Sequence, residues 1–384
     1  MEIVELLEII NRGEDSSHQF KRSVDSPNAL AAEMAAFSNS RGGLLIIGVD
    51  DDGTIIGLSP SEIAATNNRI SNAASQGVNP AISTWSDNIT IGDKTIIVVD
   101  IPQGLRKPCL DKDGIVWVKN GADKRKVTSR DELLRLYQAS DLAHADESPV
   151  PGANISDLDL EYFADYFRLD KGESLDDQDL ALPEILHNMG LMSNGSLNLS
   201  CVLLFGKNPQ VKLPAFFVTA AAYPSNDLGG STYTDSQDIK GKLVDLIPQT
   251  VNFITRNLRH VQGERSVNSI GEPEIPQSAI EELVVNALVH RDYFISDPIK
   301  VFVFLDRVEI ISPGVLPNNL TVENIKNGVS NRRNSILTSF DPPQYRGHGS
   351  GIKRVLKTHP RTYFINDIEG NRFIAILYRA SYEE

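Results

Sequence analysis

The sequence GLLIIGV at residues 43–49 is an uninterrupted apolar run with the length of a β-strand. Such a run is typical of a strand that is buried on both faces. Gly42 and Gly43 permit a sharp turn into this strand from the apolar, helix-like segment 28–38, and Asp52-Gly53 favours a hairpin turn after it. The run therefore predicts mixed α and β structure in the first part of the chain.

Hydrophobic periodicity and turn residues predict the other elements of an α+β fold. In the first part we expect helices at 2–11, 28–38, 60–75 and 129–138, and strands at 43–49, 95–101 and 114–120. In the second part we expect helices at 157–167, 183–189, 239–260 and 276–290 and one beginning near 349, with strands at 199–206 and 215–223, a strand pair at 299–311 and a last strand at 372–380.

Length and composition indicate an ordinary globular protein of two or three domains, because the chain has 384 residues, 41% of them hydrophobic and 23% charged. The segment His144–Asn154, HADESPVPGAN, is short, polar and rich in proline and glycine, as linkers are. We therefore predict a domain at 1–140, a linker at 141–154 and a domain at 155–384.

Composition also argues against several classes of protein. No apolar run approaches the roughly 18 residues that span a bilayer, and the acidic start lacks the basic region of a secretory signal. The two cysteines, Cys109 and Cys201, exclude a disulfide framework and a cysteine-based zinc site. We expect a cytoplasmic protein with no membrane partner. The net charge of −14 argues against nonspecific coating of DNA but allows a local basic face.

Acidic side chains occur at two places in the first part, within Glu14–Lys21 (EDSSHQFK) and at Asp50–Asp52, where the predicted strand ends. Converging carboxylates can hold Mg²⁺, which prefers oxygen ligands. An acidic turn that only meets solvent is the alternative, and the sequence leaves both open.

Basic side chains are concentrated between residues 119 and 135. Such side chains can contact phosphates and position a nucleic acid without reading its sequence, whereas an ordinary solvated surface is the alternative. The candidates for nucleic-acid contact are Lys21, Arg22, Arg41, Lys119, Lys124, Arg125 and Lys126.

The QFK sequence at 19–21, the double glycine, the apolar strand and the turn GVDDDG together resemble the Schlafen-like, AlbA-type nucleic-acid-binding domain over residues 10–138. The resemblance implies an AlbA-like α/β domain that binds nucleic acid. Some Schlafens are RNases that place two glutamates and an aspartate around a metal. Here these positions fall on Glu14, on Gln19 and on Asp50 or Asp51. Gln19 is neutral and a poor metal ligand, which lowers the expectation of phosphodiester cleavage.

Two stretches in the second part carry candidate nucleotide chemistry. In EELVVNALVHRDY, residues 281–293, Glu282 and Asn286 share one face of the predicted helix, where a carboxylate and an amide can orient water and ligate Mg²⁺. In RGHGSGIKR, residues 346–354, alternating glycines precede a helix whose first N–H groups attract anions. A solvated helix face and a flexible loop are the respective alternatives.

These stretches, with DRVEIISPGVLP between them, resemble the divergent GHKL-type ATPase domain that accompanies Schlafen-like domains and is often labelled as similar to a RecG helicase C-terminus. The similarity covers about 270–360, with 155–265 as a less diagnostic companion. It implies a GHKL-like α/β sandwich that uses ATP and Mg²⁺, and at least a homodimer. The chain has no helicase motifs, so we expect no motor activity.

The resemblance also implies roles by position. Glu282 would be the general base of a slow ATPase, Asn286 the Mg²⁺ ligand and Gly314 a neighbour of the nucleotide base. The residues that would contact phosphate are Arg332, Arg333, Gly347, Gly349 and Gly351. The family's adenine-binding aspartate is replaced here by Ser312-Pro313-Gly314, so the resemblance implies neither strict adenine specificity nor fast turnover.

Three hypotheses follow. The first is an ATP-responsive nucleic-acid-binding protein, either a transcriptional regulator or a defence-associated factor, that binds DNA or RNA, with DNA as the favoured partner. The second is a Schlafen-like nuclease, dependent on Mg²⁺ or Mn²⁺, that acts on RNA or DNA through Glu14 and Asp50 or Asp51. The third is an assembly protein in which both sites are vestigial.

Overall fold

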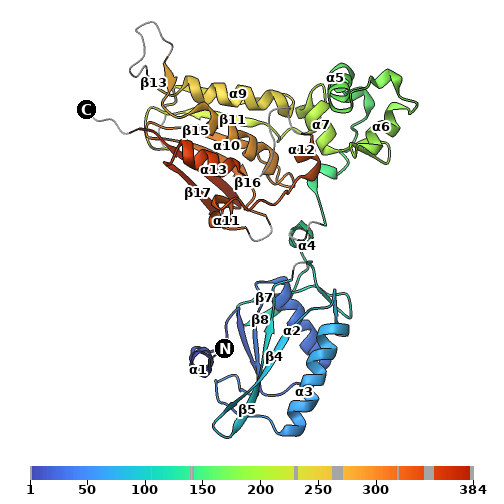
Figure 1. Cartoon of the computed structure of the whole chain (residues 1–384), viewed down its shortest axis with the longest axis vertical. Helices are drawn as coiled ribbons and strands as arrows, with labels where there is room; N and C mark the ends of the chain where they lie inside the picture. The colour runs from blue at the N-terminus through green and yellow to red at the C-terminus, as the bar shows by residue number, and fades with distance from the viewer. Residues whose placement is uncertain are drawn as a thin grey trace. The chain divides into compact units, whose positions relative to one another are not determined.

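The computed structural model describes residues 2–104, 106–138, 140, 142–228, 232–261, 271–317, 320–340 and 350–380. The chain divides into two compact units, Met1–Ala143 and His144–Glu384. Figure 1 draws the first unit in blue to teal and the second in green to red. Among the described residues, no helix combines the length and the apolar character needed to cross a membrane.

The first unit contains a four-stranded sheet with strand order β1, β2, β5, β4 and two small ladders, β3 with β6 and β7 with β8. Strands β1 and β2 are parallel, and the other neighbours in the large sheet are antiparallel. The elements are α1 (Ile3–Arg12), β1 (His18–Lys21), α2 (Pro27–Asn39), β2 (Gly43–Ile47), α3 (Pro60–Asn72), η1 (Ala73–Gly77), β3 (Val78–Asn79), β4 (Trp85–Ile91), β5 (Lys94–Ile101), β6 (Leu110–Asp111), β7 (Trp117–Asn120), β8 (Asp123–Lys126) and α4 (Arg130–Gln138).

Strand β2 is packed on both faces, as its apolar sequence predicts. Leu45 and Ile47 belong to one core cluster with residues of α2 and α3, whereas Ile46 packs with Leu6 and Ile10 of α1 on the other face. Because helices cover both faces, successive side chains of the strand are all apolar. The unit therefore has three layers, with the sheet between α1 and the pair α2 and α3.

The double glycine before β2 is required by close packing. Gly42 and Gly43 have φ angles of +75° and +155°. A Cβ at Gly43 would overlap the carbonyl oxygen of Ser17 and the ring of Phe37. Only glycine combines this backbone conformation with this approach, so the predicted sharp turn is confirmed.

The second unit is built on a six-stranded sheet with strand order β12, β11, β15, β16, β18, β17. Helices α9 and α13 each pack against α10, and the three form a helical layer against the sheet (Figure 1). The mixed helices and sheets confirm the α+β class. The elements are η2 (Ala145–Glu147), η3 (Ile155–Asp157), α5 (Leu160–Lys171), η4 (Leu175–Asp177), α6 (Leu182–Asn188), β9 (Met192–Ser193), β10 (Ser196–Leu197), α7 (Leu199–Phe205), α8 (Pro209–Lys212), β11 (Val218–Ala222), β12 (Asp235–Ile239), α9 (Leu243–Arg256), β13 (His260–Val261), β14 (Glu272–Pro273), α10 (Gln277–His290), β15 (Ile299–Val303), β16 (Arg307–Pro313), α11 (Val322–Lys326), α12 (Ser335–Ser339), α13 (Gly351–Thr358), β17 (Thr362–Asp367) and β18 (Arg372–Tyr378).

Two predicted elements differ from the structure. The strand expected at 199–206 is wrong, because these residues form helix α7, whose N-cap Asn198 accepts a hydrogen bond from the N–H of Cys201 at 2.9 Å. Every residue of α7 is buried, so its sequence shows no polar face that separates a buried helix from a buried strand. The helix expected at 239–260 is shorter and runs from Leu243 to Arg256, and Ile239 is instead the last residue of β12.

The expected linker lies largely inside the second unit, which begins at His144. Ala145, Val150 and Ala153 are buried in its core, and the N–H of Val150 donates to the carbonyl oxygen of Leu197 at 2.9 Å. The proline and glycine content indicated a segment without long helices or strands. It did not reveal that the few apolar side chains of the segment reach the core.

Candidate functional site

A buried polar cluster joins β1, α2 and the β7–β8 hairpin in the first unit. The Lys119 ammonium donates to Gln19 Oε1 at 2.7 Å, to Glu33 Oε1 at 3.2 Å and to the carbonyl oxygen of Ala122. Lys124 Nζ donates to the other carboxylate oxygen of Glu33 at 2.7 Å. The side chains of Lys119 and Glu33 are only 1% and 2% exposed. Burial lowers the pKa of Lys119, and the Glu33 carboxylate opposes that shift.

This cluster corrects part of the predicted nucleic-acid surface. Lys119 cannot reach a phosphate, because its ammonium is buried and already satisfied within the protein. Lys124 is partly exposed but bound to the same carboxylate. Arg125 is exposed and forms a two-point ion pair with Glu132, at 3.0 and 2.6 Å. The sequence placed all these charges at the surface because spacing alone does not report burial.

The other predicted basic residues lie at or near the surface of the first unit. Arg41 and Lys126 are exposed, and Lys21 is partly exposed. Arg22 is exposed as well, with its guanidinium 3.6 Å from the carboxylate of Asp50. These residues retain the ability to contact phosphates.

Trp117 is a functional candidate that the sequence reasoning missed. The ammonium groups of Lys124 and Lys126 lie 5.8 and 5.3 Å from its ring, and its Nε1 donates to Asp111 Oδ2 at 2.7 Å. An anchored, half-buried indole can stack a base while the exposed Lys126 beside it contacts a phosphate. The signal was present in the sequence as an aromatic residue at the start of the basic stretch.

The predicted nuclease ligands each make local contacts in the first unit. Glu14 Oε1 accepts a hydrogen bond from the N–H of Phe20 at 2.7 Å. Asp50 lies in the turn after β2, where its own carboxylate accepts from the N–H of Asp51 at 3.2 Å. Within the described part of the chain, the one group of three histidine or acidic side chains close enough to share a metal is elsewhere, at residues 144–147. The three predicted carboxylates, Glu14, Asp50 and Asp51, therefore do not form such a group.

A cavity in the second unit brings together predicted residues from distant parts of the sequence. It lies between α10, β16, the segment 329–338 and the beginning of α13. Its lining includes five of the predicted site residues, namely Glu282, Asn286, Gly314, Arg332 and Gly351. The lining also includes the apolar side chains of Leu283, Ile310, Leu316, Ile325 and Phe373. Gly347 and Gly349 lie outside the described residues.

Glu282 occupies the polar side of this cavity. Its carboxylate accepts from Asn286 Nδ2 at 3.1 Å and from Arg354 Nη2 at 2.8 Å. The spacing of four residues on α10 places Glu282 and Asn286 on one face, as predicted. Arg354 was not predicted as a site residue, although its position three residues after Gly351 places both on the same face of α13.

Glycine is needed where α13 approaches Glu282. A Cβ at Gly351 would overlap the Glu282 carboxylate. Gly314 has a φ angle of +94°, and a Cβ there would overlap the side chains of Asp292 and Arg333. Both glycines therefore allow close approach within or beside the cavity.

The two predicted phosphate-binding arginines behave differently. Arg332 is exposed and lines the cavity. The guanidinium of Arg333 instead donates to the carbonyl oxygens of Val315 and His290, at 2.6 and 3.5 Å. Burial lowers the pKa of His290, which also lines the cavity, to about 4, and the guanidinium of Arg333 adds to that shift. Arg333 thus ties loops together, and His290 is neutral at pH 7.

Ser312 lies at the position where the resembled ATPase family has its adenine-binding aspartate. Its side chain is buried, and its hydroxyl donates to the carbonyl oxygen of Ala287 at 3.3 Å. The cavity lining at this point therefore offers a hydroxyl that is bonded to the backbone and carries no charge.

Several solved structures are similar to this chain, among them the two that follow. The DIP2311 protein from Corynebacterium diphtheriae is 20% identical with a TM-score of 0.45, and the match covers 95% of this chain and 65% of that protein. The N-terminal domain of a RecG-related protein from Nitrosomonas europaea is 26% identical with a TM-score of 0.25, and that match covers 33% of this chain and 94% of the domain. No curated protein shows significant similarity to the chain.

Two segments match known protein families. Residues 14–128 match the family described as "Schlafen, AlbA_2". Residues 296–363 match the family described as "Putative ATP-dependent DNA helicase recG C-terminal", whose domain is of the HATPase type. Both family types connect the chain to nucleic acid and to ATP. The chain therefore combines a Schlafen AlbA_2 domain in its first unit with a recG C-terminal HATPase-type domain in its second.

Proposed function

We propose that the chain is a cytoplasmic, ATP-responsive regulator that binds DNA through its first unit and ATP with Mg²⁺ in the cavity of its second unit. The observation that carries the proposal is the cavity itself. It gathers Glu282, Asn286, Gly314, Arg332 and Gly351 from four separate stretches of the sequence. We expect the regulator to act as a dimer, with hydrolysis as a slow switch.

The cavity offers a complementary group for each part of ATP–Mg²⁺. The first N–H groups of α13 and the guanidinium of Arg332 favour phosphate. The side-chain oxygen of Asn286 suits Mg²⁺, and Glu282 is positioned to orient water. The apolar side chains of the lining, among them Leu283 and Phe373, suit a nucleotide base.

The first unit offers charge and stacking for a nucleic acid. Arg41 and Lys126 are exposed, and Trp117 lies beside the Lys126 ammonium. Phosphate contacts from such residues contribute affinity that falls as salt rises. The indole adds stacking that accepts any base.

A gel-shift titration tests the regulatory proposal. Labelled DNA and RNA are titrated with protein and Mg²⁺, with and without ATP, and we expect DNA to be retarded with an affinity that ATP changes. Lys126→Glu should weaken DNA binding by about tenfold at low salt because it reverses one charge near the phosphates. The control Lys171→Glu reverses an exposed charge on α5 of the second unit and should bind like wild type. A wild-type affinity that is the same with and without ATP would contradict the switch.

The same samples, run under denaturing conditions, test the nuclease hypothesis. We expect intact strands in both Mg²⁺ and Mn²⁺, because the predicted carboxylates do not form a ligand group and Gln19 accepts from Lys119. Shortened strands that become intact with Glu14→Ala would reverse this conclusion and favour the nuclease.

Gly351→Ala should impair the nucleotide site without unfolding the protein. The new Cβ would overlap the end of the flexible Glu282 side chain, which can move away. That movement breaks the 2.8 Å contact with Arg354, so we expect ATP affinity, measured by calorimetry, to fall by about tenfold, or about 1.4 kcal/mol. The neighbouring Ser350→Ala serves as the control. Equal ATP affinities for the two variants would show that Glu282 does not contribute to binding.

A further inference from the structure

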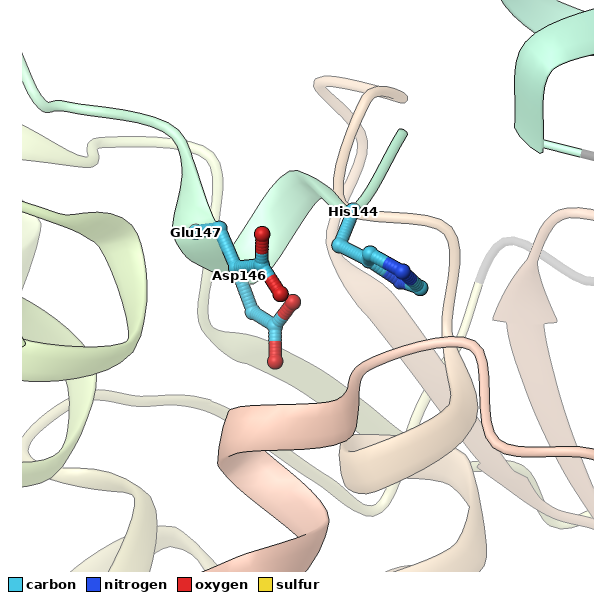
Figure 2. Close-up of side chains that lie close together, drawn as sticks. All are labelled: His144, Asp146 and Glu147. Atoms are coloured by element: carbon cyan, nitrogen blue, oxygen red, sulfur yellow. The ribbon is translucent and has the colours of Figure 1, made fainter. Parts of the chain in front are cut away.

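Three potential metal ligands meet at the start of the second unit. His144, Asp146 and Glu147 each offer one ligand atom, and these atoms all lie within 4.8 Å of one another. They belong to the short turn η2 and the residue before it. Figure 2 shows the carboxylates of Asp146 and Glu147 directed toward each other, with the His144 imidazole on the same side of the turn.

One carboxylate oxygen of Asp146 accepts hydrogen bonds, and the other accepts none in the part of the chain that the structure describes. The residue is fully buried, and its Oδ2 accepts from the N–H groups of Ile336 and Leu337, at 2.8 and 3.0 Å, where α12 begins. Its Oδ1 is also buried, and within the described residues it has no hydrogen-bond partner. A buried carboxylate oxygen without a partner is costly, so this atom calls for a cation or a proton.

The surroundings of Asp146 favour a cation that binds several groups at once. Burial raises the pKa of Asp146, and the hydrogen bonds from the N–H groups of Leu337 and Ile336 oppose that shift. The nearby Glu147 carboxylate raises the pKa further, and His144 lowers it. One divalent ion between the two carboxylates removes their repulsion. A histidine that binds a metal usually donates its other ring N–H to a backbone carbonyl, and Nδ1 of His144 lies 3.3 Å from the carbonyl oxygen of Arg333.

We propose that His144, Asp146 and Glu147 bind a divalent transition-metal ion, Zn²⁺ in preference to Mg²⁺. One imidazole with two carboxylates is a zinc-type ligand set that leaves a fourth position for solvent. Ligands held at about 2.1 Å in a tetrahedral zinc site lie about 3.4 Å apart, so the three groups need only small movements to close on the ion.

An ion at this position would stabilise the contact between the start of the second unit and residues 333–337. The same three side chains contact the backbone or side chains of residues 333–337, through the bonds of Asp146, the contact of His144 with Arg333 and the 3.3 Å hydrogen bond from Ser335 Oγ to Glu147. Residues Arg332 and Thr338, on either side of this segment, line the nucleotide cavity. The ion would therefore fasten one wall of the cavity to the start of the unit.

The test is zinc binding by the full chain, without an affinity tag and after removal of metals with a chelator. Calorimetry with Zn²⁺ alone, in the absence of nucleotide, should show one strong site per chain, and elemental analysis after dialysis should show one retained zinc. His144→Gln and Glu147→Gln should each weaken binding by at least about tenfold, because even the loss of groups that only orient ligands costs that much. Zn²⁺ should also raise the melting temperature of wild type but not of either variant.

The controls separate this site from other sources of affinity. Glu161→Gln changes an exposed carboxylate of α5 in the same unit, and Glu282→Gln changes the nucleotide cavity, so both should bind zinc like wild type. Matching circular dichroism spectra establish that the His144 and Glu147 variants are folded. Zinc binding that is absent in wild type, or unchanged in His144→Gln and Glu147→Gln, overturns the proposal. If wild type binds no zinc, a proton shared between Asp146 and Glu147 would instead explain why the buried Asp146 Oδ1 has no other partner.

Discussion

Asn286→Ala is expected to weaken the binding of ATP with Mg²⁺ by about 100-fold, or about 2.8 kcal/mol. Asn286 lines the cavity and donates to Glu282 at 3.1 Å. The substitution removes both the oxygen that would ligate Mg²⁺ and the group that orients the Glu282 carboxylate. Calorimetric titration with ATP in the presence and absence of Mg²⁺ measures the effect, and the loss should be much larger in the titration with Mg²⁺.

Two variants control this experiment. Asn252→Ala makes the same change at an exposed position of α9 and should bind ATP like wild type. Asn286→Asp retains an oxygen ligand and should keep a Mg²⁺-dependent affinity well above that of the alanine variant. Equal affinities for wild type and Asn286→Ala would remove Asn286 from the metal site. Absence of ATP binding by wild type would remove the nucleotide proposal altogether, while leaving the zinc proposal to its own test.

Lys119→Met is expected to destabilise the first unit by about 3 kcal/mol, because breaking a buried ion pair leaves its partners without compensation. The change removes the donor to Gln19 and Ala122 and one of the two cations that neutralise Glu33. Both tryptophans, Trp85 and Trp117, are in the first unit. Urea unfolding followed by tryptophan fluorescence therefore reports on that unit within the intact chain.

The control is Lys112→Met, which replaces an exposed lysine of the same unit and should change the unfolding free energy by less than about 0.5 kcal/mol. The prediction separates a structural role for Lys119 from its expected role as a phosphate contact. If Lys119→Met unfolds like wild type but binds DNA more weakly, the phosphate contact is the correct role and the buried ion pair contributes little.

Local patterns in the sequence were enough for the strand at 43–49 and for the shared face of Glu282 and Asn286. An apolar run and a spacing of four residues both depend on backbone geometry that repeats within one element. The glycines before β2 could also be recognised from the sequence, because the turn that requires them is formed by neighbouring residues. The α+β class and the two family resemblances depended on such local features.

Longer-range packing accounts for the differences. LSCVLLF forms a helix because its whole circumference is buried, and Lys119 turns inward because Glu33 is presented to it by α2, 86 residues earlier in the chain. Arg333 stands beside Arg332 in the sequence, yet its guanidinium is held by two backbone carbonyls. Nothing in a linker-like segment indicated that Asp146 caps α12, 190 residues later.

The sequence by itself determined the class of fold and the two family resemblances, because these follow from periodicity, composition and short motifs. Only the tertiary structure decided which basic side chains are exposed and can meet a phosphate. Lys119 and Arg333 are occupied within the protein, whereas Lys126 and Arg332 remain exposed. The physical reason is that burial and pairing depend on residues brought together from distant parts of the chain. The free energy of a charge is set by those neighbours rather than by its position in a motif.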